Sequence, residues 1–429
     1  MTINNEHKKL NFLSEREQNQ ACLNSAEHEK NQGRKVLNVP NLRFPEFQGE
    51  WEEKRVSEIA DLFKGNGISK EQLTDTGEPC ILYGELYTKY KSEIISDIFS
   101  KTDIDTRKLV KSKANDVIIP CSGETAVDIA TARCVPYDNI LLGGDLNIIR
   151  LYDCDGSFMS YQLNGKRKYD IAKVAQGVSV VHLYGDHLKG VKTYNPCLEE
   201  QKKIVRLLSL LDERIATQSK IIDKLQSLIK GINQRVFKNS GNNYKLGEIC
   251  EIRSGYSGSQ LLSKKGLKVS RIETISGHKV NLERVGYVAP FESSENYKLQ
   301  VGDILFSNIN SVEYIGNTAF IDKDYDLYHG MNLLRLTPNH MVVIPFYLYL
   351  LLNTNRMLNR FKTICNKAVS QASINQTELG KTVVQIPPIN TQEQICELYQ
   401  ALYTKLETES HTKSLFQNQK QYLLRQMFI

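Results

Sequence analysis

Two stretches of this sequence open in the same way: "NPCLEEQKKIVRLL" at 195–208 and "IPPINTQEQICELY" at 386–399. In each, a proline precedes the Glu/Gln-rich start of a helix. The offset that aligns Pro196 with Pro387 also aligns identical residues from 178/369 to 237/428. The matched polar pairs are Ser179/Ser370, Gln201/Gln392, Thr217/Thr408, Ser219/Ser410 and Gln226/Gln417. Chance explains shared apolar positions in two amphipathic helices, but it explains matched Pro, Gln, Thr and Ser less well. The pattern therefore indicates a duplication.

The duplication extends toward the N-terminus of each copy. "VSEIADLFKG" at 56–65 resembles "LGEICEIRSG" at 246–255, and "GDLNIIRL" at 144–151 parallels "GMNLLRL" at 330–336. The order of these segments is preserved while their offset drifts, as insertions in loops would make it. We predict two copies of one unit, each a globular domain followed by a long helix.

The fold class predicted from these signals is mixed α/β. "DVIIP" (116–120), "NIIRL" (147–151), "DILFS" (303–307) and "NLLRL" (332–336) are typical of buried strands, whereas "VSEIADLF" and "IPFYLYLLLN" are typical of helices. We expect a polar N-terminal extension that is flexible, then a globular domain and a helix, twice. The predicted boundaries are 1–37, 38–198, 199–239, 240–386 and 387–429.

The two predicted helices carry apolar residues at heptad spacing, which favours an antiparallel coiled coil within the chain. Forty residues of helix reach roughly 60 Å, longer than a compact domain needs. Both stripes turn polar at Gln218 and Glu409, which could fix the register. The alternative is that each helix packs only on its own domain. The candidate seam and partner-docking residues are Ile204, Leu208, Leu211, Ile215, Ile222, Leu225, Ile229, Ile395, Leu402, Leu406, Phe416 and Leu423.

Composition excludes several classes of protein. The chain has 429 residues, 41% hydrophobic and 24% charged, with a formal net charge of +6 that permits nucleic-acid binding without demanding it. None of the nine cysteines lies in a CxxC pair, so neither a disulfide framework nor a zinc site is expected. Residues 1–34 are polar and charged, so we do not expect them to form a signal peptide. The most apolar stretch, 341–352, is too short to span a bilayer. We expect a cytoplasmic protein with no membrane role.

The motifs of catalytic sites are absent from the sequence. There is no G-x-x-x-x-G-K-[ST] phosphate loop, no glycine-rich cofactor turn and no H-E-x-x-H metal motif. "NPC" at Asn195 lacks the second proline and the aromatic residue that a DNA amino-methyltransferase needs, and "IPPI" at Ile386 lacks the leading amide. We expect no active site in this chain and no metal or cofactor of its own.

The segments "GVSVVHLYGDHLKGVKTYNPCLEEQKKI" and "AVSQASINQTELGKTVVQIPPINTQEQI" resemble the repeated boundary of type I restriction-modification specificity subunits. "NVPNLRFPEFQGEWEEKRVSEIADL" (38–62) is similar to the usual beginning of such subunits. The resemblance runs from about residue 38 to the C-terminus. Two features depart from the family's pattern: the extension before residue 38, and Thr391-Gln392 where Glu-Gln is expected.

The resemblance implies a function for each part. Each globular domain resembles a target recognition domain, and each helix a spacer that sets the gap between two half-sites of a split double-stranded DNA target. A member of this family would bind two methyltransferase subunits and, with them, restriction/translocase subunits. S-adenosylmethionine and ATP would be bound by those partners. Half-sites about one turn, roughly 34 Å, apart would place both domains on one face of the DNA.

Phosphate and base-edge contacts require Lys, Arg and small polar or amide side chains near loops. In the first domain the candidates are Lys64, Asn66, Tyr83, Tyr87, Ser122, Lys166, Arg167, Lys168, Gln176 and Ser179. In the second they are Arg253, Tyr256, Arg271, Ser307, Asn308, Asn310, Arg360, Lys362, Lys367, Ser370 and Gln371. The basic residues 166–168 and the Arg360/Lys362/Lys367 group hold corresponding places in the two copies. A different class of function also fits the duplication: a scaffold that recruits two identical proteins through its helices without reading DNA.

Overall fold

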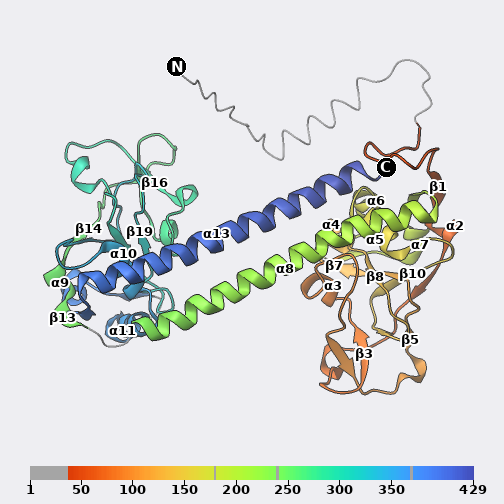
Figure 1. Cartoon of the computed structure of the whole chain (residues 1–429), viewed down its shortest axis with the longest axis horizontal. Helices are drawn as coiled ribbons and strands as arrows, with labels where there is room; N and C mark the ends of the chain where they lie inside the picture. The colour runs from red at the N-terminus through yellow and green to blue at the C-terminus, as the bar shows by residue number, and fades with distance from the viewer. Residues whose placement is uncertain (1–36, 178–179, 238–240, 368–370) are drawn as a thin grey trace, which may run out of the picture. The chain divides into compact units, whose positions relative to one another are not determined.

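The computed structural model describes residues 37–177, 180–237, 241–367 and 371–429. The chain folds as two compact units. Unit 1 contains the described residues up to Asp212 together with Gln419–Ile429, and unit 2 is Glu213–Asn418. Two long helices, α8 (Leu198–Val236) and α13 (Ile389–Gln426), each contribute one part to unit 1 and the other part to unit 2 (Figure 1). The expectation for residues 1–37 falls, apart from Leu37, outside the described residues.

Unit 1 is built on a four-stranded antiparallel sheet in the order β2-β10-β6-β8. Its strands are β2 (Ala60–Lys64), β10 (Leu146–Leu151), β6 (Asp116–Pro120) and β8 (Arg133–Val135). A second sheet, β4-β3-β9-β5, contains Ser100–Thr102, Glu78–Ile81, Leu141–Leu142 and Val110–Lys111. Helix α5 (Gly156–Asn164) packs across β6 and β8, and α6 (Lys168–Val174) packs against α5. The expected strands at 116–120 and 147–151 are thus confirmed.

Unit 2 repeats this plan. Its four-stranded antiparallel sheet has the order β14-β20-β17-β19, with strands Cys250–Ser254, Leu334–Pro338, Ile304–Phe306 and Thr318–Phe320. Helices α10 (Pro345–Leu352) and α11 (Asn355–Ile364) take the places of α5 and α6 in the chain order. In both units a short strand before the domain pairs with the strand before the long helix: β1 (Glu52–Arg55) with β12 (Lys192–Asn195), and β13 (Asn242–Lys245) with β23 (Val383–Ile386). The internal repeat is therefore structural.

The shorter elements complete the two copies. They are α2 (Val56–Ile59), α3 (Glu85–Thr88), α4 (Ala126–Ile129), α7 (Gly185–Lys189), α9 (Leu246–Ile249), α12 (Gln376–Gly380), β7 (Ser122–Gly123), β11 (Val181–His182), β15 (Leu267–Val269), β16 (Gly286–Val288), β18 (Ile309–Asn310), β21 (Asn366–Lys367) and β22 (Ala372–Ser373). The helix expected over "VSEIADLF" is wrong beyond its first turn, because Ala60–Lys64 joins the sheet beside β10. Pairing with a neighbouring strand there outweighs the helical spacing of the apolar residues.

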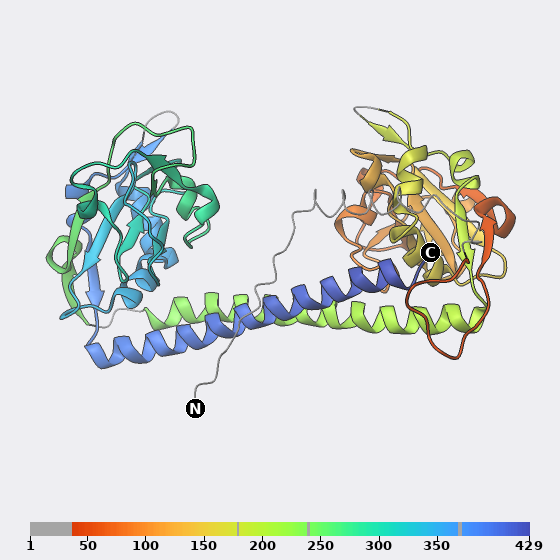
Figure 2. The same ribbon diagram turned by 90° about the horizontal axis from the view of Figure 1, so that it is seen from above.

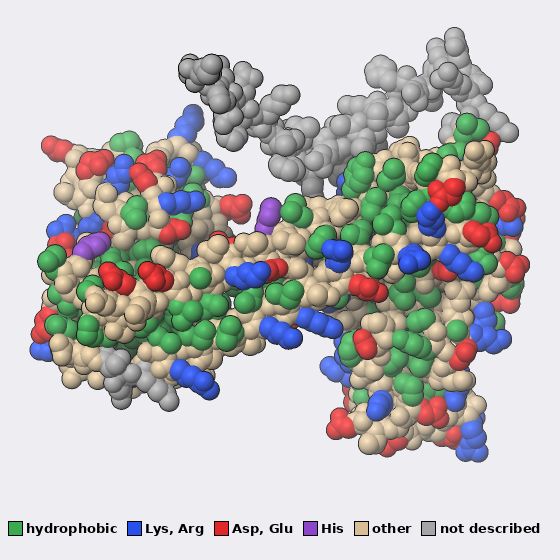
Figure 3. Space-filling model, viewed as in Figure 1, with side chains coloured by type: hydrophobic (Ala, Val, Ile, Leu, Met, Phe, Trp, Pro, Cys, Tyr) green, Lys and Arg blue, Asp and Glu red, His purple; other side chains and the backbone are tan. Residues whose placement is uncertain are grey.

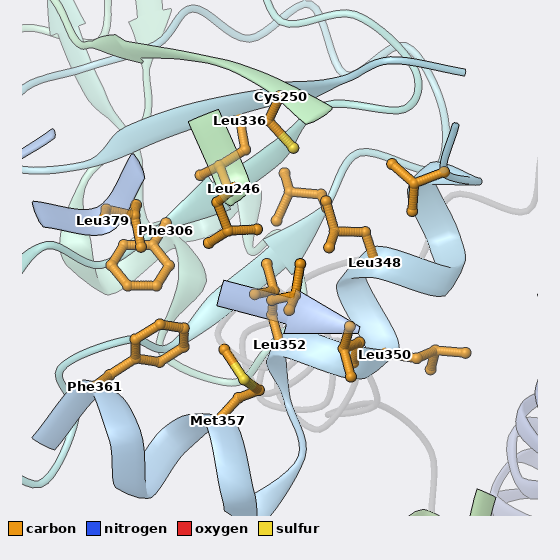
Figure 4. Close-up of a cluster of buried hydrophobic side chains, with 14 of the residues drawn as sticks. Leu246, Cys250, Phe306, Leu336, Leu348, Leu350, Leu352, Met357, Phe361 and Leu379 are labelled. Carbon is orange, nitrogen blue, oxygen red and sulfur yellow. The ribbon is translucent and has the colours of Figure 1, made fainter. Parts of the chain in front are cut away.

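The core of unit 2 lies between its sheet and its helices. Leu246, Phe306, Leu336, Leu348 and Phe361 are fully buried and meet in one cluster, which Figure 4 shows. The rings of Phe306 and Phe361 pack edge to face with centroids 5.0 Å apart. The same cluster contains seam residues of both long helices, so the helices and the globular part of unit 2 share one core.

The long helices also contact each other inside each unit, in antiparallel directions. In unit 2, Gln218 donates to the backbone carbonyl of Glu409 at 3.2 Å and to its carboxylate, and the side chain of Tyr399 is hydrogen-bonded to Asn233. In unit 1, Lys420 near the end of α13 meets Asp212 of α8. The polar break expected at Gln218 and Glu409 thus joins two counterpart residues of the repeat.

One buried glutamine explains why the same sequence opens both helices. Gln201 donates to the carbonyl oxygen of Pro196 at 2.9 Å and accepts from the N–H of Asp155, the N-cap of α5, at 2.9 Å. Gln392 donates to the carbonyl oxygen of Pro387 at 2.8 Å and accepts from the N–H of Ile344, the N-cap of α10, at 2.8 Å. Each glutamine ties the incoming strand, the long helix and the first helix of the core together.

We predict that Gln392→Leu destabilises unit 2 by about 1–3 kcal/mol, because it leaves the Ile344 N–H and the Pro387 carbonyl buried without partners. Denaturant unfolding, followed by a probe in unit 2, measures the loss. Gln394→Leu is the matched control, since Gln394 is exposed on the same turn of α13. Equal midpoints for the two variants would contradict this role of Gln392.

Candidate nucleic-acid interface

A short hairpin projects from the globular part of unit 1, at its edge away from α8 (Figure 2). Gln176 and His182 exchange backbone hydrogen bonds of 2.9 and 2.6 Å, and β11 then pairs with β7 through His182↔Ser122 and Val181↔Gly123. Gly177 permits the turn: its φ is +119°, and a Cβ there would lie 2.1 Å from the carbonyl oxygen of Val180. The hairpin is therefore held against the segment that follows the central strand β6.

Unit 2 has a hairpin at the corresponding place. β22 pairs with β21 on one side and with β18, which follows the central strand β17, on the other. Ala372 lies between Lys367 and Asn310 in this small sheet. Figure 2 shows the hairpin at the edge of unit 2 away from α13. The two copies thus present equivalent hairpins with different side chains.

Three predicted residues of unit 1 meet beside its hairpin. Tyr83, Tyr87 and Ser122 line a cavity of about 730 Å³, together with Arg133 and Val180. The hydroxyl of Tyr87 donates to the carbonyl oxygen of Ser122 at 3.0 Å, and burial raises the pKa of this tyrosine well above its usual range. Tyr87 therefore acts here as a neutral aromatic surface and a hydrogen-bond donor.

The other predicted residues around this site are placed less uniformly. Lys64 is exposed and lies 4.0 Å from Asp145, a weak surface pair. Asn66 uses its side chain locally, donating to the carbonyl of Lys108 at 3.0 Å. Gln176 is exposed at the base of the hairpin, with Nε2 3.5 Å from Nε2 of His187. Ser179 lies outside the described residues.

The basic stretch 166–168 does not form one charged surface. Lys166 is exposed, whereas Arg167 lies over the ring of Tyr194 at 5.3 Å and pairs with Asp170 at 3.1 Å. Lys168 is half-buried, and burial lowers its pKa. Of the three, Lys166 alone keeps an exposed side chain for a phosphate contact.

The predicted residues of unit 2 divide in the same way. Ser307, Asn308, Asn310, Lys367 and Gln371 lie on or beside the hairpin sheet, with Asn310 donating to Ser307 Oγ at 3.1 Å. The structure brings these five together, although they are far apart in sequence. Ser370 lies outside the described residues.

Most of the remaining residues predicted in unit 2 have partners inside the protein. Arg360 donates to the carbonyl of Val383 at 3.0 Å, and Lys362 is half-buried near the end of α11. Arg253 pairs with Glu251 at 2.5 Å, and Arg271 lies 3.5 Å from Glu273. Tyr256 stacks on Phe291 with centroids 3.9 Å apart. Arg360 is thus held at β23 rather than at the hairpin with Lys367.

Sequence reasoning missed three aromatic side chains next to the hairpin of unit 1. His182 and Tyr184 lie with ring centroids 6.1 Å apart, and Tyr184 and His187 with centroids 5.5 Å apart. The Nδ1 of His182 is 3.3 Å from Ser122 Oγ, and Tyr184 is 51% exposed. The sequence signal was the three aromatic side chains within 182–187. They could be assigned to the site only once the pairing of β11 with β7 was known. Aromatic faces of this kind can stack on bases.

On the face shown in Figure 3, Lys and Arg side chains are interspersed with Asp and Glu. Among the described residues, no group of three or more His, Cys, Asp and Glu side chains could hold a metal ion. No helix in the described ranges is long and apolar enough to cross a membrane.

His329 is a buried histidine of unit 2 that is hydrogen-bonded to Tyr256 through the backbone. It is 1% exposed, its Nε2 lies 3.0 Å from the carbonyl oxygen of Leu333, and its own carbonyl accepts from the N–H of Tyr256 at 2.9 Å. Burial lowers the pKa of His329 to about 4, while Leu333 opposes that shift.

We predict that unit 2 loses about 3 kcal/mol between pH 7 and pH 4 through this one residue. The unfolded chain binds a proton as the pH falls through the ordinary histidine value near 6.5, while the folded chain does not until about 4. The loss therefore develops within this window and levels off below it. Denaturant unfolding at several pH values, in wild type and in His329→Asn, isolates the difference. Parallel pH profiles would refute the assignment.

Comparison with known proteins places both copies in one family. The model of the type I restriction modification DNA specificity domain matches residues 48–227 and again 240–415. A putative type I restriction enzyme MjaX specificity subunit of Methanocaldococcus jannaschii is 38% identical over 188 residues, which are 43% of this chain and 44% of that relative. The MjaVIII specificity subunit of the same organism is 23% identical over 89% of this chain and 92% of its own length.

Solved structures agree on the fold. The type I restriction-modification S subunit from M. genitalium aligns with a TM-score of 0.59 and 17% identity, over 91% of this chain and 99% of that one. A chain from work on complex assembly and conformational transition of the type I R-M system aligns with a TM-score of 0.56 and 18% identity, over 88% and 97% of the two chains. At such identities the likeness concerns the fold alone.

Proposed function

The chain belongs to the family of type I restriction-modification DNA specificity subunits, and from this membership we propose that it reads a two-part DNA target for a methyltransferase. Each globular part reads one half of the site. The long helices dock two methyltransferase subunits and, through them, the restriction/translocase subunits. The chain itself performs no catalysis, and S-adenosylmethionine and ATP are bound by its partners.

The observation that carries this proposal is the repeated hairpin. Both units build it from the same strands, but they fill it differently: Ser122, Gln176 and His182 in unit 1, Asn310 and Lys367 in unit 2. A scaffold that recruits two identical proteins has no use for two equivalent but chemically different edges. Two recognition surfaces for two different half-sites do require them, because base edges are distinguished by hydrogen-bonding pattern.

The deciding experiment sequences methylated bases in host DNA with and without the gene for this chain. We expect N6-methyladenine to disappear at one split motif when the gene is removed, and to return on complementation. This outcome identifies both half-sites and their gap. An unchanged pattern, in cells whose methyltransferase is active, would instead favour the scaffold.

We predict that Lys64→Ala, Lys166→Ala and Lys367→Ala each weaken DNA binding of the assembled complex almost independently of sequence. Each lost phosphate contact should reduce the slope of log K against log salt by about 0.9. Filter binding or fluorescence anisotropy over a salt series measures the slope. Lys192→Ala is the matched control, because this exposed lysine lies on β12 beside the start of α8. Wild-type slopes for all three, with methyltransferase subunits still bound, would exclude these residues from the DNA surface.

A further inference from the structure

A buried ionic cluster holds the end of α13 in unit 1. Lys420 is 7% exposed; its ammonium lies 2.5 Å from Asp212 Oδ1 and is also paired with Glu93, which is 7% exposed. Asp212 accepts further hydrogen bonds from Tyr161 at 2.7 Å and from Ser92 at 3.0 Å. One turn away, Leu208 and Leu424 are both buried.

Unit 2 offers an internal control, because the offset that aligns Pro196 with Pro387 continues along both helices. The counterparts of Asp212 and Lys420 are Tyr403 and Ile229, and both belong to the apolar cluster of unit 2. The counterparts of Leu208 and Leu424 are Tyr399 and Asn233, whose side chains are hydrogen-bonded. The polar pair and the apolar pair have therefore exchanged places between the two copies.

The fold itself does not require either arrangement, since the same helix positions are filled in opposite ways. A buried ion pair adds little net stability, but removing one partner leaves an uncompensated charge and is strongly destabilising. Such a pair can therefore discriminate between partners, because a wrong partner leaves a buried charge without its counterpart.

We propose that these two exchanged pairs select which helix end each unit accepts. On unit 1, the surface formed by Leu208, Asp212 and Glu93 fits the C-terminal end of α13. It rejects the C-terminal end of α8 from a second copy of the chain. That end would place Ile229 against Asp212 and Glu93, and Asn233 against Leu208. If the end of α13 from a second copy lay on unit 2, Lys420 would face Tyr403 and find no carboxylate there. Leu424 would face the hydroxyl of Tyr399.

The competing assembly follows from the duplication. Because α8 and α13 are counterparts, two chains could pair α8 with α8 and α13 with α13. The C-terminal end of each α8 would then lie on unit 1 of the other copy, and the C-terminal end of each α13 on unit 2 of the other copy. The exchanged pairs make both of these homotypic pairings mismatched and leave the pairing within one chain matched. This inference concerns assembly of the chain alone and holds whether or not the proposed DNA target is correct.

The test exchanges the pairs between the helix ends in the full-length chain. In the variant Ile229→Lys, Asn233→Leu, Lys420→Ile, Leu424→Asn, the homotypic pairings become matched and the pairing within one chain becomes mismatched. We expect light scattering after size exclusion to give twice the mass of wild type measured at the same concentration. The control Gln421→Ile, Arg425→Asn makes similar changes at exposed positions of the same turns of α13 and should keep the wild-type mass. A fourfold variant with the wild-type mass would overturn the proposal.

A second variant decides the matter if the fourfold variant aggregates. Lys420→Ile, Leu424→Asn leaves unit 2 unchanged. Hydrogen exchange of the backbone amides in 422–428 should accelerate at least tenfold, while the amides of β17 and β20 keep their wild-type protection. Wild-type protection at 422–428 would show that the cluster does not select the helix end, and the proposal would fail.

Discussion

The attachment of each long helix to its globular part is the constraint on which the rest of the structure depends. Gln201 and Gln392 satisfy backbone groups of the preceding strand and of the first core helix at once, and both are nearly inaccessible to solvent. This fixes the direction in which 38 or 39 residues of helix leave the core. The contacts between the two helices inside each unit depend on that direction.

The duplication, the central strands and the long helices could be predicted from the sequence because their signals are periodic and repeated. Continuous apolar runs predict buried strands such as 116–120 and 303–307, and heptads sustained over many turns predict the helices. The alternation of helix and strand at 56–64 could not be read locally. There, the pairing of Ala60–Lys64 with β10, a partner far along the chain, decides the conformation.

The directions of the candidate side chains could not be predicted from the sequence, for a physical reason. Lysines and arginines near a loop are recognisable in a sequence, but their direction is not. Arg167 is drawn inward by Tyr194 and Asp170, whereas the exposed Arg360 is held at the surface by its hydrogen bond to the carbonyl of Val383. The gathering of Ser307, Asn310 and Lys367 depends on strand pairing between segments some sixty residues apart. No local sequence pattern predicts that these residues come together.

The buried ionic cluster of unit 1 also bears on how such a gene can be rearranged. Of its members, Ser92, Glu93 and Tyr161 belong to the globular part, Asp212 to α8 and Lys420 to α13. A globular domain acquired from another chain by recombination would replace the first three and leave the last two in place. An incoming domain that lacks a carboxylate in the position of Glu93, or groups that donate to Asp212, would leave the retained pair of Asp212 and Lys420 without those contacts. Modularity at the level of whole domains is thus limited by a few buried atoms at their junction with the helices.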